Sequence, residues 1–206
     1  MTGVFIVFEG AVSAGKKTHV KLLEERLKSM GKEVVTISFP SYETEIGKII
    51  RGWITRSLPL SPETASMLYA ADRMQYQDRI KEWLKKDWVI IIDRYCYSNI
   101  VYQSALGLSK QWLIDLERPI VKPDIVFLMD VPSEDITRGM RQESLQKFLN
   151  IEEQKPQESL KDRVRNGFLE LANNPPYGEK WYVIDTTRPV EEVQVEILDI
   201  VQKRMS

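Results

Sequence analysis

Residues 10–18 have a composition and spacing that could hold the phosphates of a nucleotide. Gly10 is followed after four residues by Gly15 and Lys16, directly after the apolar segment 4–8. Glycines at these positions let backbone N–H groups curl around phosphate oxygens, and the lysine neutralises phosphate charge. The next position normally carries a hydroxyl for Mg²⁺, but Lys17 stands there and Thr18 comes one position later. The alternative is a plain strand–turn–helix connection; the apolar segment before the loop and the amphipathic segment after it favour phosphate binding.

A carboxylate closes the most apolar segment of the chain. Asp93 follows residues 89–92, and Arg94 comes next. Ligands of parallel sheets bind beyond the carboxyl ends of the strands, so we expect Asp93 near the phosphate-binding loop, where it could hold Mg²⁺ directly or through water. The guanidinium of Arg94 suits a bridging contact to phosphate. The alternative is a structural Asp–Arg pair at a strand end.

Short apolar segments alternate with longer amphipathic ones, and this pattern predicts the elements that position these groups. Strands are predicted at 4–8, 34–39, 89–93, 125–131 and 181–185, and helices at 18–30, 46–54, 61–85, 98–106, 110–117 and 189–204. Apolar strands that alternate with helices are typical of a parallel sheet covered on both faces, so the predicted fold class is α/β. The polar segment 142–157 predicts a flexible flap, with a solvated surface helix as the alternative.

Composition narrows the classes of protein. The chain has 206 residues, which fits one domain, and its formal net charge of −1 disfavours a nucleic-acid binder. No segment approaches the roughly 20 apolar residues of a membrane span, and we expect no signal peptide. Cys96 is the single cysteine and His19 the single histidine, which excludes an internal disulfide and a multi-cysteine metal site. The default compartment is a reducing cytoplasm.

Motifs that follow one another along the chain resemble those of the thymidylate kinase family. They are Phe-Ile-Val-Phe-Glu-Gly at 5–10, Phe39-Pro40, Leu-Tyr-Ala-Ala-Asp-Arg at 68–73, Asp93-Arg94-Tyr95 with Ser98 and Tyr102-Gln103, Lys-Pro-Asp at 122–124, Asp-Val-Pro at 130–132 and residues 163–172. The resemblance implies a three-layer P-loop kinase fold whose five-stranded parallel sheet has the order 2-3-1-4-5. It implies one domain over 1–206 with a flexible lid at about 138–157, in a cytoplasmic homodimer. The implied reaction transfers a phosphoryl group from ATP, with Mg²⁺, to dTMP.

The resemblance also implies a role for each matching side chain. The catalytic set is Lys16, Asp93 (also the metal ligand), Arg94, Arg138 and Arg141. The ATP-binding set is Gly10, Ser13, Ala14, Gly15, Lys16, Lys17, Thr18 and Arg188, with Arg188 beside adenine. The set for dTMP is Phe39, Tyr42, Arg51, Tyr69, Arg73, Arg94, Ser98, Asn99, Tyr102 and Gln103. In that set Phe39 and Tyr69 line the thymine pocket, and Arg73 donates to a base carbonyl. Asn99 and Gln103 read the polar edges of the base, and Tyr102 disfavours a ribose.

Three positions depart from the family pattern. Val12 stands where the loop usually carries an aspartate, and Lys17 replaces the usual metal-binding hydroxyl. An arginine that often follows the Phe-Pro pair is absent, so Tyr42 or Arg51 would have to contact the acceptor phosphate. These departures predict a working kinase that is slow or altered in its use of metal. Two alternatives stay open: a kinase of another pyrimidine monophosphate such as dUMP, and a nucleotide-binding relative impaired in catalysis.

Overall fold

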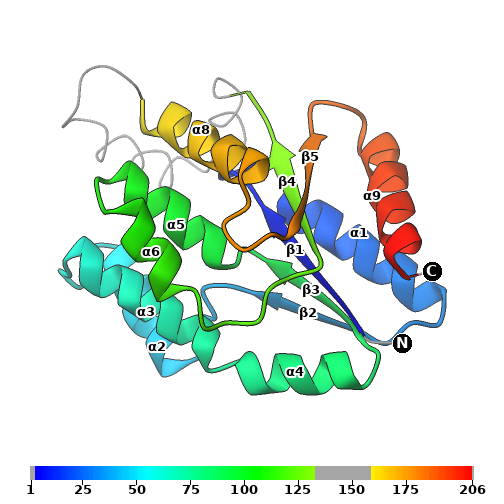
Figure 1. Ribbon diagram of the computed structural model, residues 1–206, viewed down its shortest axis with the longest axis horizontal. Coiled ribbons are helices and arrows are strands. Elements are labelled where there is room, and N and C mark those ends of the chain that lie inside the picture. Colours follow the sequence, from blue (N-terminus) through cyan, green and yellow to red (C-terminus); the bar gives the residue numbers. More distant parts are fainter. Residues whose placement is uncertain (1–2, 133–158, 206) are drawn as a thin grey trace.

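The computed structural model describes residues 3–132 and 159–205, and Figure 1 shows how their elements are arranged. The strands in these ranges are β1 (Val4–Glu9), β2 (Val34–Ser38), β3 (Val89–Asp93), β4 (Ile125–Asp130) and β5 (Lys180–Asp185). The helices are α1 (Lys16–Ser29), α2 (Glu45–Ile54), α3 (Pro62–Met74), α4 (Gln77–Lys85), α5 (Cys96–Ala105), α6 (Lys110–Leu116), α8 (Leu160–Asn173) and α9 (Val190–Met205).

The five strands form one parallel sheet in the order β2-β3-β1-β4-β5, which confirms the predicted fold class and strand order. β1 lies between β3 and β4, with Phe8 opposite Asp93 in the register of β1 and β3. Because the strands are parallel, the ends of β1, β3 and β4 meet at one edge of the sheet. That edge carries the phosphate-binding loop.

The two faces of the sheet bury two separate apolar cores. Alternate residues of β1 point to opposite faces, so that Phe5 and Val7 pack against the α5 and α8 side while Ile6 and Phe8 pack against α1 and α9. Helices therefore cover both faces, as Figure 1 shows. None of the helices within 3–132 and 159–205 is long and apolar enough to cross a membrane.

The helix predicted at 61–85 is two helices, and this prediction was wrong. α3 ends at Met74 and α4 begins at Gln77. The Gln77 amide donates to the backbone oxygen of Arg73 (2.8 Å), and its own oxygen accepts from Val121 N (2.7 Å). The Tyr76 hydroxyl lies 2.6 Å from that of Ser41. The contacts with Val121 and Ser41, which are distant in the sequence, engage polar groups at the break, and helical periodicity cannot reveal them. α8 was not among the predicted helices.

Candidate functional site

Residues 10–15 turn the chain from β1 into α1. Gly10 has a φ of 136°, and a Cβ atom there would lie 2.4 Å from the backbone oxygen of Met129, so only glycine fits where the loop leaves the sheet. Gly15, with a φ of 75°, is the N-cap of α1. No side chain caps this helix, and its first turn carries no acidic residue. Uncapped N–H groups at the positive end of a helix make a site for an anion.

The ammonium group of Lys16 lies inside this loop. Its Nζ donates to the backbone oxygens of Gly10 (3.1 Å) and Ala11 (2.6 Å), and the residue is only 6% exposed. Burial lowers the pKa of Lys16 to about 7; the charge of Arg94 adds to this lowering, and that of Asp93 opposes it. Near pH 7 the Lys16 side chain is therefore protonated in only a fraction of the molecules. A bound phosphate would favour the protonated form.

The other predicted loop residues differ in exposure. Ser13, Lys17 and Thr18 are exposed, whereas Ala14 is buried against the core of the α1 face. Lys17 adds an exposed positive charge to the positive end of α1, which is unfavourable for an isolated helix and favourable next to an anion.

Asp93 has a carboxylate oxygen that no residue within 3–132 and 159–205 engages. Its Oδ1 atom is buried and makes no hydrogen bond to any described residue. No group of three or more His, Cys, Asp or Glu that could hold a metal occurs within 3–132 and 159–205. One carboxylate beside a phosphate loop fits Mg²⁺, because this ion keeps several waters and takes its other ligands from nucleotide phosphates. The residues present therefore suit a magnesium ion that arrives with its nucleotide.

Arg94 joins the phosphate loop to α5. Its Nη1 donates to the backbone oxygen of Gly10 (3.1 Å) and to Ser98 Oγ (3.1 Å), and its guanidinium lies 5.7 Å from the centre of the Tyr102 ring. The residue has a φ of 66°, a left-handed conformation that costs a side-chain-bearing residue free energy. Such strain is typical of a functional turn, and here it directs the guanidinium back towards the loop.

Glu9, the last residue of β1, is a site residue to which the sequence analysis gave no role. Its fully buried carboxylate accepts from Tyr95 N (2.8 Å), Ser98 N (3.0 Å) and Ser98 Oγ (2.6 Å). Burial raises the pKa of Glu9, while the bond from Ser98 and the charge of Arg94 lower it. Glu9 therefore fixes the start of α5 and the serine that holds Arg94. Its signal was available, because it ends an apolar strand next to Gly10 as Asp93 ends β3.

α2, α3 and the segment before α2 contribute aromatic side chains, and two of these, Tyr42 and Tyr69, lie close enough to Arg94 to be affected by its charge. The guanidinium of Arg51 lies 4.6 Å from the centre of the Tyr42 ring, a cation–π contact. Tyr69 packs edge-on against Trp53, with ring centres 6.0 Å apart, and burial raises the pKa of its hydroxyl, which keeps it neutral. Phe39 is 4% exposed and packs edge-on against Tyr76.

A second buried carboxylate organises the polar groups behind these rings. Glu117 pairs with Arg73, whose Nε and Nη2 both donate to it, and accepts from Asn99 Nδ2 (2.7 Å). The Oδ1 of Asn99 and the Oε1 of Gln103 are buried and make no hydrogen bond within the described residues. Buried acceptors without partners are costly unless a ligand or water satisfies them. No sequence signal marked Glu117, because its partners lie 44 and 18 residues away.

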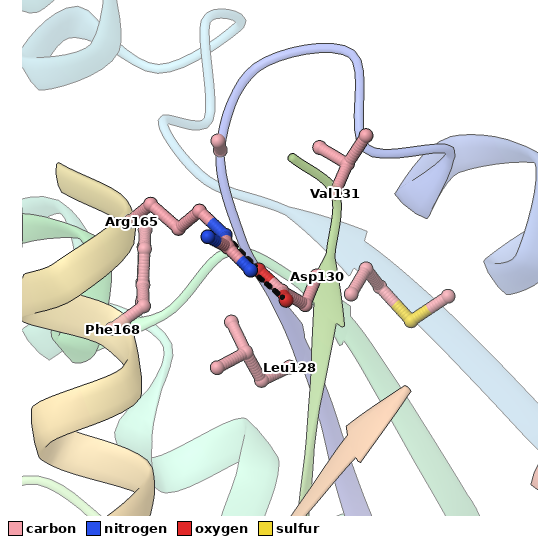
Figure 2. Close-up of a pocket in the computed structure, with 7 residues that line it drawn as sticks. Leu128, Asp130, Val131, Arg165 and Phe168 are labelled. Atoms are coloured by element: carbon pink, nitrogen blue, oxygen red, sulfur yellow. Dashed lines mark hydrogen bonds and ion pairs between the residues drawn. The ribbon is translucent and has the colours of Figure 1, made fainter. Parts of the chain in front are cut away.

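A small hollow beside the phosphate loop is occupied by an ion pair. Figure 2 shows Arg165, from α8, reaching Asp130 at the end of β4, with Leu128 and Phe168 beneath. Both bonds are 2.8 Å long, and the side chains are 33% and 19% exposed. This bidentate pair ties α8 to the edge of the sheet that carries the loop.

Three predicted arginines are not among the side chains described so far. Arg188 follows β5 and pairs with two glutamates of α9, Glu196 at 2.6 Å and Glu192 at 3.7 Å. These contacts direct Arg188 towards α9, and its predicted place beside adenine stays a prediction. Arg138, Arg141 and the predicted lid lie outside the described residues.

The fold and the loop define a P-loop nucleotide-binding protein, and comparisons with known proteins specify its family. The family model described as thymidylate kinase matches residues 8–197. A probable thymidylate kinase of Thermococcus kodakarensis is 37% identical over 97% of each chain. Thymidylate kinase of Plasmodium falciparum is 34% identical, over 98% of this chain and 90% of its own. This chain belongs to the thymidylate kinase family, whose members are ATP-dependent nucleoside monophosphate kinases, as the sequence predicted.

Solved structures agree with this assignment. The thymidylate kinase of Candida albicans superposes with a TM-score of 0.75 at 25% identity, over 99% of this chain and 93% of its own. The thymidylate kinase of Ehrlichia chaffeensis, at 23% identity and a TM-score of 0.73, shares the fold. The roles of individual side chains in this chain remain predictions, and the contacts above supply the physical support for them.

Proposed function

We propose that this protein transfers the γ-phosphoryl group of ATP to the phosphate of dTMP, which yields dTDP and ADP. The observation that carries the proposal is the position of Arg94. Its guanidinium bonds to the phosphate loop through Gly10 and lies against Tyr102 of α5. One cation thus borders both the loop that takes a nucleotide triphosphate and the polar groups that suit a pyrimidine. A phosphoryl transferase needs a cation at that junction, because charge develops there in the transition state.

The donor half of the site is the phosphate loop. The uncapped start of α1 and Lys16 bind the β- and γ-phosphates, and Asp93 would hold Mg²⁺ directly or through water. When bound, Mg²⁺ neutralises charge on the phosphates. An oxygen of the dTMP phosphate then attacks the γ-phosphorus, the bond from that phosphorus to the β–γ bridging oxygen breaks, and ADP leaves. Lys16 and Arg94 stabilise the negative charge on either side of the transferred group.

The acceptor half holds dTMP by its phosphate and its base. Tyr42, Arg51 and Arg94 contact the phosphate; the stacked Tyr42–Arg51 pair supplies charge where many relatives carry an arginine after the Phe-Pro motif. Tyr69 lies against the thymine ring, as aromatic side chains do with bases.

The assay that tests the proposal measures ADP release with ATP and Mg²⁺, with and without dTMP. Release that depends on dTMP is the expected result, and dUMP in place of dTMP measures acceptor range. No dTMP-dependent release would refute the proposal. If dTMP then still raised the melting temperature, the chain would be a nucleotide-binding relative that lacks turnover. Val12 and the exposed Lys17 are the residues that favour this second candidate.

We also propose that the protein is a homodimer, as the resemblance implies. Exposed apolar side chains on α2 and α3, among them Ile49, Ile54 and Met67, supply contact area that a monomer leaves in water. Light scattering after size-exclusion chromatography tests this; a mass near 24.0 kDa, that of one chain, would refute it.

A further inference from the structure

Glu117 is a fully buried carboxylate on which groups from two other helices converge. It lies at the C-cap of α6 and is 0% exposed. Arg73 of α3 donates to both of its oxygens, through Nε and Nη2, and Asn99 of α5 donates to Oε1. A buried ion pair of this kind adds little to stability compared with apolar packing. The effect of Glu117 on the conformations of Arg73 and Asn99 is therefore more informative than its contribution to stability.

The first effect is to fix the orientation of the Asn99 amide. One N–H of Nδ2 donates to Glu117 Oε1 (2.7 Å) and the other to the backbone oxygen of Ser66 (3.1 Å). A flipped amide would lose both bonds and set its oxygen against two acceptors. Asn99 is 3% exposed, and its Oδ1 is buried without a partner among the described residues. Asn99 therefore presents a fixed acceptor.

The second effect is to fix the guanidinium of Arg73. Nε and Nη2 are committed to Glu117, which leaves the Nη1 end of the planar group to reach a ligand. Arg73 cannot act as an acceptor, so it presents a fixed donor. Arg73 Nη2 and Asn99 Nδ2 donate to the same oxygen of Glu117, which holds the two side chains next to each other.

A donor next to an acceptor complements the edge of a 4-oxo pyrimidine. It does not complement the corresponding edge of a 4-amino pyrimidine. A 4-oxo pyrimidine offers a carbonyl oxygen beside an N–H group, which matches Arg73 and Asn99 at both positions. A 4-amino pyrimidine offers an amino group beside a bare ring nitrogen, which opposes them at both. Two opposed buried contacts reject a ligand far more strongly than one missing methyl group does.

We propose that Glu117 is the positioning residue that makes the acceptor site selective for 4-oxo over 4-amino pyrimidine nucleotides. It acts through Asn99 and Arg73 and does not touch the base itself. This inference rests on the proposed function, since it concerns the acceptor of the same reaction. It concerns only the 4-oxo edge, which dUMP and dTMP share. Substitution of Glu117 should therefore affect dUMP as it affects dTMP.

The test compares kcat/KM for dTMP, dUMP and dCMP in the wild type and in Glu117→Gln. A glutamine has one acceptor oxygen for three converging N–H groups, so the Asn99 amide is freed to flip and Arg73 loses half of its fork. We expect kcat/KM for dTMP and dUMP to fall about 10- to 100-fold, chiefly through KM, with dCMP unchanged or improved. The matched control is Glu170→Gln on α8, which removes only an exposed contact with Lys110 and should leave all three values unchanged.

Other results of these assays would refute either the proposed function or the role of Glu117. A wild type without dTMP-dependent turnover refutes the proposed function itself. A working wild type whose Glu117→Gln variant loses dTMP and dCMP turnover by the same factor shows a merely structural glutamate. If Glu117→Gln does not fold, Asn99→Ala tests the acceptor, because it leaves the Arg73–Glu117 pair in place; an unchanged dTMP/dCMP ratio there refutes the inference. In a double mutant, effects on that ratio that simply add would also refute action through Asn99.

Discussion

When the pH lies well above 7, binding of ATP should be coupled to the uptake of a proton by Lys16. Burial lowers the pKa of this lysine to about 7, although its Nζ donates to the carbonyl oxygens of Gly10 and Ala11. Most molecules of the free protein therefore hold Lys16 neutral at pH 8. A triphosphate against the ammonium group favours the charged form and raises its pKa again. The bound protein then carries one proton more than the free protein.

The sign and size of the pH dependence follow from this linkage. Well below pH 7 Lys16 is charged before and after binding, so the affinity does not change with pH on its account. Above pH 7 the affinity falls as pH rises, and the limiting slope is tenfold per pH unit. With a pKa of about 7, ATP should bind about eightfold more weakly at pH 8.5 than at pH 7.5. The terminal phosphate of ATP, with a pKa of about 6, is already ionised in this range.

Isothermal titration calorimetry measures the proton directly. A non-hydrolysable ATP analogue is titrated at pH 8 in buffers that differ in ionisation enthalpy, and the slope of observed against buffer enthalpy counts the protons taken up. We expect about 0.9 proton, since roughly one Lys16 in eleven is charged at that pH. Lys16→Met should abolish the uptake. A slope near zero in the wild type, or an equal slope in the variant, would refute the reasoning.

Two further predictions concern helix α2 and the phosphate loop. Gly47→Ala should destabilise the protein by about 2 kcal/mol or more, because the new Cβ would lie 1.9 Å from the backbone oxygen of Ser41. Gly52→Ala in the same helix is the control. Its new Cβ would meet only side chains, at 3.2 Å or more, and should change stability by less than about 1 kcal/mol. Equal denaturant midpoints for the two variants would contradict the close contact at Gly47. Lys17→Thr combined with Val12→Asp should raise kcat and lower the Mg²⁺ concentration for half-maximal turnover roughly tenfold. Unchanged values would mean that neither position limits catalysis.

The sequence could predict the parallel sheet and the position of Asp93 beside residues 10–15 because both depend on local patterns. Apolar strands indicated burial on both faces, and Asp93 was expected beside the phosphate loop because strand ends share one edge. The register, with Phe8 opposite Asp93, confirms that expectation. The helix predicted to begin at residue 61 does begin there, because Ser61 is the N-cap of α3 and its hydroxyl accepts from Thr64 N (3.2 Å).

The parts that could not be predicted depend on contacts across the fold. Glu117 meets Arg73 over 44 residues of sequence, and nothing local marks it as buried. The break between α3 and α4 depends on Gln77 meeting Val121, a contact that periodicity does not encode. Glu9 differs, because the rule that singled out Asp93, a carboxylate at the end of an apolar strand, applies to it as well.

Helix α5 connects the two halves of the site through consecutive residues. Ser98 bonds to Glu9 and to Arg94, on the proposed side of phosphoryl transfer, while Asn99 bonds to Glu117, on the proposed side of the base. Successive residues of a helix point about 100° apart, so one short segment can engage two buried carboxylates in different directions. Both carboxylates therefore restrain the same helix. A shift of α5 that lengthened the hydrogen bonds to one carboxylate would distort those to the other. In the proposed reaction, base recognition and the placement of Arg94 thus depend on a single rigid element, which would keep the two substrates in register for transfer.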